Sequence, residues 1–493
     1  MTYTVVRLDF DMRNIKRFSI DALMNEVKVN YIDRFLRLFF VVFGILVLFQ
    51  KLIARNIHSL PLTNIFMATD DVLVLVIFML VLLRRYFTHR CIRAPAVLVP
   101  LALFVTIGLL SSILNKVPLI IWLGQSFLYI KGFLLFIACM NIDFNAKAIA
   151  GYVKTFSITA SIILILGLVD FVFPAEFRSL INNTGYSDWR SGIPSVKSIF
   201  THPGVYGWFT TFTALFAFAF FIVYKKWGYF FFGFAFMFFG SFLSMRTKAL
   251  GGIVVGIITG LIFCKEARFE RLKLSALFIL TIAVTLAPNI SYIAPQLHQK
   301  ANAYFKPLAR YYVHSAQDYS DNKKIRNIDS ETLHKEARNV LYAKSFEIAN
   351  DYFPFGAGMG RFGSEMSRKY YSPLYQQYGI EKVMGLSKAS NNYITDTFWP
   401  MVLGETGYFG LACYGLTLFL IIVRVCKVLF AAQDKLIYAF LLGTTMIFAE
   451  SLFESLAEPV YSSPPAAYFI FVLCGIAFSL YYADIKKADN ARN

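Results

Sequence analysis

The chain has 493 residues, of which 57% are hydrophobic, 17% aromatic and only 16% charged, and its formal net charge is +18. Soluble domains carry about 25% charged residues, so the composition excludes an ordinary soluble protein and indicates an integral membrane protein. The positive charge does not predict a nucleic-acid partner, because the Lys and Arg residues lie mainly between apolar runs, where they orient membrane helices.

Long apolar runs fill most of the chain, and one polar insert near residues 288–398 interrupts them. About 20 helical residues cross a bilayer core of ~30 Å, so each run predicts one spanning helix. We therefore expect an all-α polytopic membrane protein with about twelve transmembrane helices and one large, partly helical loop domain. The predicted helices lie near 35–54, 62–83, 95–114, 119–141, 149–173, 203–223, 227–244, 248–264, 272–288, 399–423, 436–456 and 461–482.

Basic residues in the loops orient these helices. Under a twelve-helix count most of them fall on one side, which the positive-inside rule makes cytoplasmic. The first 34 residues hold no apolar core with a cleavage site, so the first helix is expected to be its own anchor. The expected order is a cytoplasmic arm (1–34), nine helices (35–288), an outer loop domain (289–398), three helices (399–482) and a cytoplasmic tail (483–493).

The six cysteines all lie outside the polar insert, and no CxxC or Cys/His metal spacing occurs. The sequence therefore predicts neither a disulfide framework nor a structural zinc site, and we expect packing to hold the insert together. HExxH, GxSxG and Ser/His/Asp arrangements are also missing from the sequence. We expect no metal and no cofactor.

Two cations stand out in the short turn at residues 244–248, between the seventh and eighth predicted helices. Arg246 and Lys248 lie on the outer side, where the positive-inside bias disfavours them. They are either snorkelling side chains at the interface or an anion site. Arg provides a planar fork for phosphate and Lys adds a point charge.

The segment 336–349 has a loose helical stripe of apolar residues and predicts an amphipathic helix in the outer domain. His334, Arg338 and Tyr342 are four residues apart and share one face of it. That face is either an ordinary solvated surface or part of a substrate site. Glycines alternate with bulky residues in the following segment, 351–363, but the GxxxxGK[ST] order is missing. We expect a tight turn packed close to the bilayer there, not a nucleotide site.

Further candidates flank the predicted helices. Asp396 precedes the tenth helix, where it either accepts a proton at the outer surface or caps the helix. His202, at the outer start of the sixth helix, is interpreted first as a hydrogen-bonded structural residue.

Ionisable residues also fall within the predicted helices. Charges in lipid are costly and usually face the bundle interior, so together these residues predict a polar cavity that opens outward. A structural pair between Lys131 and a glutamate is an alternative use. The residues are Lys131, Asp170, Glu405, Glu450 and Glu454.

Taken in order, these motifs resemble the O-antigen polymerase (Wzy) and O-antigen ligase superfamily of bacterial membrane glycosyltransferases. The S-x-R turn at 244–248 precedes a small-residue helix, as in that superfamily. The stretch from Arg338 to Gly360 resembles its pattern of an arginine, a helix, an acid-x-x-proline and a glycine-rich turn. Residues 392–410 resemble its return to the membrane, and 200–207 another of its motifs. The resemblance covers roughly residues 120–480.

The resemblance implies a metal-independent enzyme that acts on undecaprenyl-pyrophosphate-linked oligosaccharide at the periplasmic face of a bacterial inner membrane. The superfamily's two arginines map onto Arg246 and Arg338, which would hold the pyrophosphate and stabilise its charge as the sugar–phosphate bond breaks. Lys248 would assist them. Asp396 is the candidate base, and a chain-length regulator and a flippase are candidate partners.

The remaining candidates for substrate binding are His202, His334, Tyr342 and Glu405. Ligases of the superfamily carry a histidine near the end of the large loop, whereas this chain has Asn391, Asn392 and Asp396 there. The departure favours a polymerase. A ligase that transfers glycan to lipid A core or protein, and a transporter or flippase for the lipid-linked sugar, remain the alternatives.

Overall fold

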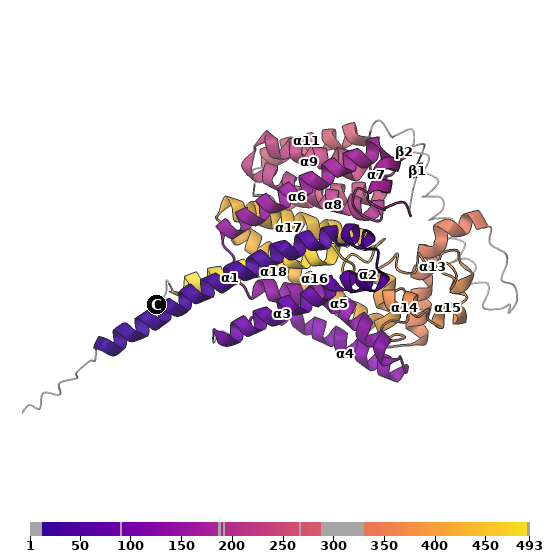
Figure 1. The fold of residues 1–493 in the computed structure, drawn as a ribbon, viewed down its shortest axis with the longest axis horizontal. Coiled ribbons are helices and arrows are strands. Elements are labelled where there is room, and N and C mark those ends of the chain that lie inside the picture. The colour runs from indigo at the N-terminus through magenta and orange to yellow at the C-terminus, as the bar shows by residue number, and fades with distance from the viewer. Residues whose placement is uncertain are drawn as a thin grey trace, which may run out of the picture.

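The computed structural model describes residues 12–88, 91–185, 189–190, 193–265, 268–286 and 330–490. In these ranges the chain is predominantly helical, and β structure is limited to one two-residue antiparallel pair. Long helices form a bundle, and short helices gather at one of its ends (Figure 1).

The bundle begins with one long helix that runs without a break past residue 34 and continues with helices of roughly bilayer length. The first part comprises α1 (Met12–Arg55), α2 (Leu60–Met67), α3 (Thr69–Phe87), η1 (Ala96–Leu98), α4 (Val99–Leu114), α5 (Leu119–Met140), α6 (Ala146–Val172), α7 (Pro174–Leu180), β1 (Trp189–Arg190) and β2 (Ile193–Pro194). The central part comprises α8 (Pro203–Tyr224), α9 (Trp227–Ala235), the π-helix η2 (Phe236–Phe242), α10 (Thr247–Phe263) and α11 (Arg268–Leu286).

The last part contains the short helices and the three closing helices. The short ones are α13 (Ser330–Asp351), α14 (Glu365–Lys369), α15 (Leu374–Gln377) and η4 (Ile380–Lys382). The closing ones are α16 (Trp399–Ala431), α17 (Lys435–Glu454) and α18 (Ala466–Asn490). We call residues 330–398 the loop domain.

All twelve predicted stretches overlap described helices, but the second falls on two helices, α2 and α3, and the twelfth begins before α18 does. Within the described ranges, nine helical stretches are long and apolar enough to cross a membrane. The predicted seventh and eighth spans correspond to the shorter apolar helices Trp227–Phe242 and Lys248–Phe263. The predicted ninth span overlaps α11. The fold is therefore that of a polytopic membrane protein.

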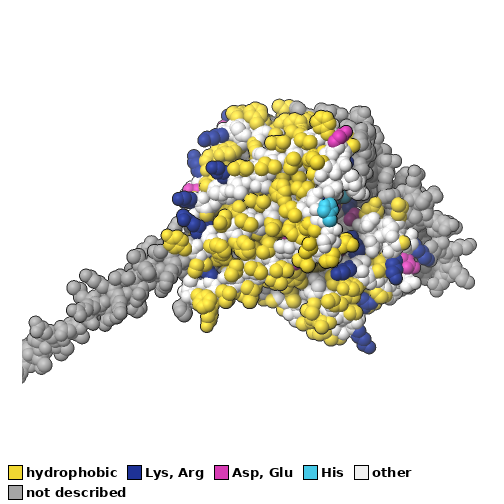
Figure 2. All heavy atoms as spheres, viewed as in Figure 1, with side chains coloured by type: hydrophobic (Ala, Val, Ile, Leu, Met, Phe, Trp, Pro, Cys, Tyr) yellow, Lys and Arg dark blue, Asp and Glu magenta, His cyan; other side chains and the backbone are white. Residues whose placement is uncertain are grey.

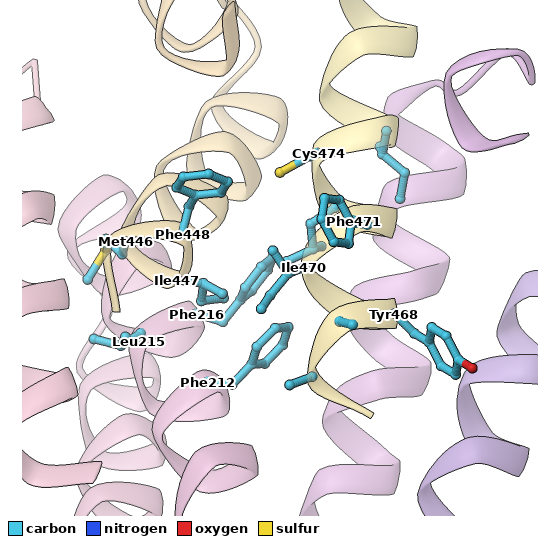
Figure 3. Close-up of a cluster of buried hydrophobic side chains, with 14 of the residues drawn as sticks. Phe212, Leu215, Phe216, Met446, Ile447, Phe448, Tyr468, Ile470, Phe471 and Cys474 are labelled. Carbon is cyan, nitrogen blue, oxygen red and sulfur yellow. The ribbon is translucent and has the colours of Figure 1, made fainter. Parts of the chain in front are cut away.

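The core of the bundle is aromatic and lies along α8. This helix is buried along almost its whole length. Figure 3 shows Phe212 and Phe216 of α8 facing side chains of α17 and α18, among them Ile447 and Phe471. Because lipid is as apolar as these side chains, close van der Waals packing is what joins the helices.

The loop domain lies at the end of the bundle opposite the C-terminus (Figure 1). It has a hydrophobic core of its own, which confirms that packing shapes it; no cysteine lies in its described residues. Hydrophobic side chains cover the flank of the bundle, and Lys and Arg gather at the end away from the loop domain and over the loop domain itself (Figure 2).

The glycine-rich turn joins the loop domain to the bundle. Gly358 has a φ of 102°, and a Cβ there would lie 3.2 Å from the Cα of Ser112 in α4. The backbone N–H groups of Ala357 and Gly358 donate to carbonyls of α16, and the Ser112 hydroxyl accepts from Met359. The expected tight, closely packed turn is confirmed, because only residues without a Cβ can approach this nearly.

Candidate functional site

The turn before α10 presents the first cation of the site. Met245 adopts a left-handed conformation with a φ of 54°, and the Ser244 hydroxyl donates to the Ser241 carbonyl at 2.6 Å. Arg246 follows as the N-cap residue of α10. The expected tight turn is confirmed, and it sets Arg246 and Lys248 at the end of the bundle.

Lys248 lies between two carboxylates. Its Nζ is 2.9 Å from Glu454 Oε1 and 2.7 Å from Glu458 Oε1. Glu454 is buried at the end of α17, and Glu458 lies in the loop that follows. The lysine is therefore held inward by an ion-pair network, and a simple snorkelling role does not describe it.

Arg338 and Tyr342 of α13 face the bundle together, as their spacing predicts. Arg338 Nε donates to the Asp396 carbonyl at 3.2 Å, and its Nη2 lies 3.5 Å from Asp396 Oδ2. Tyr342 donates its hydroxyl proton to the Leu456 carbonyl at 2.8 Å. One face of α13 thus contacts both the segment before α16 and the loop after α17.

Asp396 lies among several charged side chains. Burial raises its pKa to about 7 and the Glu458 charge adds to the rise, whereas Arg338, Lys248 and Arg246 oppose it. These four residues therefore lie within electrostatic reach of Asp396, and we call the five together the Asp396 cluster. The alternative of a helix cap is wrong, because Phe398 is the N-cap of α16 and the Asp396 carboxylate pairs with Arg338.

The same cluster shifts the pKa of Glu458 in the opposite direction. Burial alone would raise its pKa, but the Lys248 ammonium, with His202 and Arg338 beyond it, holds that pKa below its ordinary value. The two carboxylates are thus driven apart in pKa, which is a recurring feature of acid–base sites. Glu458 stays ionised while Asp396 exchanges its proton near neutrality.

His202 lies beside this cluster and has the structural role expected of it. Its Nδ1 accepts from the Gly204 N–H at 3.0 Å, which caps α8. A Cβ on Gly204 would come within 3.4 Å of Lys248 Nζ. The start of α8 is therefore packed against the lysine.

Glu405 lies outside the Asp396 cluster. It is fully buried in α16, where its carboxylate accepts from the Tyr129 hydroxyl at 3.0 Å and from the Phe362 N–H at 3.2 Å. Two residues later Gly407 interrupts the helix with a φ of 65°. These contacts of Glu405 join the glycine-rich turn to α5, away from the Asp396 cluster.

Two of the other buried charges, Lys131 and Asp170, are paired within the bundle. Lys131 Nζ lies 2.9 Å from Asp71 Oδ1, so the expected glutamate partner is wrong and an aspartate at the start of α3 takes its place. Asp170 accepts from Arg178 Nε at 2.6 Å and from the Lys197 N–H at 2.8 Å. Asp170 therefore fastens both α7 and the segment before α8 to α6.

His334 and possible metal ligands remain to be placed. His334 lies in the first turns of α13, but its side chain is outside the described residues. Within the described ranges, no group of three His, Cys, Asp or Glu side chains could hold a metal ion.

Sequence reasoning missed Glu458. The signal was available, because Glu450, Glu454 and Glu458 are spaced four residues apart and continue one helical face past the end of α17. Comparison with known proteins adds no further assignment: no family model matches the chain, and no curated protein matches it.

Proposed function

We propose that this protein is a membrane glycosyltransferase that polymerises undecaprenyl-pyrophosphate-linked oligosaccharide repeat units. One observation carries the proposal: cations from two separate parts of the chain converge on Asp396, where Arg338 Nη2 lies 3.5 Å from Oδ2 and the Lys248 and Arg246 charges lower the pKa of the same carboxyl. Fixed cations of this kind stabilise the charge that develops on a departing pyrophosphate. Arg contributes bidentate contacts to its oxygens and Lys a point charge.

In the proposed reaction, the acceptor hydroxyl oxygen bonds to the anomeric carbon of the donor sugar. The bond from that carbon to the pyrophosphate oxygen breaks, and undecaprenyl pyrophosphate leaves with the electron pair. The hydroxyl proton passes to Asp396, whose pKa of about 7 suits a general base at neutral pH.

The charge balance of the cluster supports this use of Asp396. Lys248 is neutralised by two carboxylates at 2.9 and 2.7 Å, but Arg338 meets Asp396 at 3.5 Å. Charge-assisted bonds are normally about 2.7–2.9 Å long, so the second pair is loose. A pyrophosphate would replace Asp396 on Arg338 and leave the carboxylate to the acceptor.

The proposal includes a topology of twelve spans, with both termini cytoplasmic and the loop domain in the periplasm of a bacterial inner membrane. It is supported by the placement of the loop domain and the C-terminus at opposite ends of the bundle (Figure 1). A flippase would supply the lipid-linked repeat units at this face, and a chain-length regulator would act with the enzyme there.

The test replaces each arginine in a strain that depends on this protein for surface glycan. We expect Arg246→Ala and Arg338→Ala each to abolish long-chain polymer on a gel while the protein remains in the membrane fraction. Lys382→Ala, which removes an exposed cation of the loop domain, is the matched control and should keep the full ladder. Normal chain length in both arginine variants would contradict the proposed role.

Glycan from a deletion strain separates the proposal from its alternatives. Single repeats attached to the final acceptor indicate a polymerase. Unattached lipid-linked polymer indicates a ligase, and repeats confined to the cytoplasmic leaflet indicate a flippase.

A further inference from the structure

A polar cavity of about 260 Å³ lies beneath the loop domain, and the Lys131–Asp71 pair described above is part of its lining. Its volume is just below the ~300–1,000 Å³ of most small-molecule sites. Side chains from α1, α3, α5, α16, the loop domain and the loop before α18 surround it. The polar and charged members are Gln50, Lys51, Asp70, Asp71, Gln125, Lys131, Glu365, Thr395, Ser462 and Ser463.

The charges of this cavity largely cancel. Lys131 is paired with Asp71 at 2.9 Å, and Asp70 accepts from Gln50 at 2.9 Å and from the Tyr468 hydroxyl at 2.8 Å. Its lining holds three carboxylates against two ammonium groups. The cavity therefore has no excess positive charge for a phosphate, and its amides, hydroxyls and carboxylates suit a neutral, hydroxyl-rich ligand.

One buried polar atom in the lining is unsatisfied. Gln125 is 1% exposed, and among the described residues its Oε1 has no hydrogen-bond partner. A buried acceptor without a donor is unfavourable, and a ligand hydroxyl is the kind of donor that would complete it. Gln125 is held from α5, so its position does not depend on the loop domain.

The cavity and the Asp396 cluster share a wall. Thr395 and Pro459 line the cavity, and their chain neighbours Asp396 and Glu458 belong to the cluster. A group that fills the cavity therefore lies against the chain segments that carry Asp396 and Glu458.

We propose that this cavity is the acceptor subsite, which takes a neutral sugar ring of the acceptor glycan and directs one hydroxyl toward Asp396. The inference rests on the proposed function, because it assigns the second substrate of the same reaction. The cations of the cluster hold the donor pyrophosphate on one side, and the cavity holds the acceptor sugar on the other.

Thiol labelling of the full-length protein tests the two sides separately. Ser463→Cys reports on the cavity and Ala457→Cys on the cluster, each in a Cys91→Ser background because Cys91 is exposed. The probes are the repeat-unit oligosaccharide released from its lipid by mild acid, and inorganic pyrophosphate. At ten times its dissociation constant a ligand leaves about one site in eleven free, so labelling of the protected thiol should slow about tenfold.

The expected result is that the oligosaccharide slows labelling of Ser463→Cys and that pyrophosphate does not. Adding Gln125→Leu should weaken this protection. Unchanged labelling with the oligosaccharide, or protection by pyrophosphate instead, would overturn the acceptor subsite. Failure of pyrophosphate to protect Ala457→Cys would count against the proposed function, whatever the cavity thiol shows.

Discussion

Two arginine–aspartate pairs at opposite ends of the bundle differ in burial and geometry. Arg84 of α3 meets Asp33 of α1 at 2.6 Å, with both side chains at most 3% exposed, and donates to the Asn141 carbonyl at 3.0 Å. Arg338 meets Asp396 at 3.5 Å, with both side chains 32% exposed. The first pair is closed and tight, whereas the second is open enough for another anion to enter.

The difference separates structural cations from candidate binding cations. Around Arg84, Arg93 pairs with Asp143 at 2.7 Å and Arg85 donates to the Asn141 carbonyl. The basic residues at this end of the bundle thus fasten α1 and α3 to the end of α5. The cations of the Asp396 cluster instead come from the start of α10 and from α13 of the loop domain, which are far apart in the sequence.

Replacing Arg84 should have the largest effect. Arg84→Ala leaves Asp33 buried without its cation, and breaking a buried ion pair costs about 3–5 kcal/mol. We expect most of the protein to disappear from the membrane fraction on immunoblots, with glycan polymer lost as a consequence. Arg338→Ala should leave the protein level unchanged. Equal losses of protein in both variants would remove the distinction between the two pairs.

Substitution of Gly407, where the loop domain docks on α16, should have the second-largest effect. A Cβ on Gly407, whose φ is 65° and ψ −169°, would lie 2.4 Å from the Pro354 carbonyl oxygen. Backbone strain in such a region costs about 1–3 kcal/mol before the clash is counted. We expect Gly407→Ala to lower thermal stability in detergent and to abolish polymer.

Gly379→Ala is the control for that substitution. Gly379 has a φ of 66°, but a Cβ there meets nothing within 4 Å among the described residues. Its cost should be limited to about 1–2 kcal/mol of left-handed strain. A loss as large as that of Gly407→Ala would show that conformation, not docking, explains the effect.

Asp396, in its pair with Arg338, should titrate in the physiological pH range. Since Asp396 must be deprotonated to act as a base and its pKa is about 7, the rate of polymer formation in membrane vesicles should rise with pH through about 7. Glu458→Gln removes a charge that raises this pKa, so the midpoint should shift to lower pH. An unchanged pH profile in Asp396→Asn would exclude the carboxylate as the base.

The smallest expected effect concerns the shape of the cation. Arg338→Lys keeps the charge but loses the planar fork. We expect polymer formation to fall by about tenfold, equal to ~1.4 kcal/mol in the barrier, with no change in protein level. Full activity in this variant would show that charge alone is sufficient at this position.

Much of the fold could be predicted because apolar length determines where helices form. Each predicted span overlaps helix within the described residues, and the amphipathic segment around Arg338 is helical. Hydropathy could not set the lengths near the π-helix η2, where backbone bonding departs from the ordinary α pattern. Nor could it show that α1 extends from Met12 through the predicted boundary at residue 34.

The candidate site was predictable only in part. Periodicity placed Arg338 and Tyr342 on one face, but it could not show that they meet the segments at Asp396 and Leu456, because helix packing brings these together. Choosing a partner for Lys131 required knowing that α3 begins with Asp70 and Asp71 beside α5. Pairing across helices depends on the order of the bundle, which spacing along one helix does not contain.

The ion-pair network around Lys248 joins residues that are synthesised at different times. Lys248 is made before the loop domain, whereas Glu454 and Glu458 emerge only with the end of α17 and the segment after it. A nascent chain that has inserted its first helices therefore lacks the counter-charges that hold the lysine inward. The Lys248 network is completed only when α17 and the segment after it have been made, so a polypeptide truncated before α17 should lack the proposed activity even if it is stably inserted.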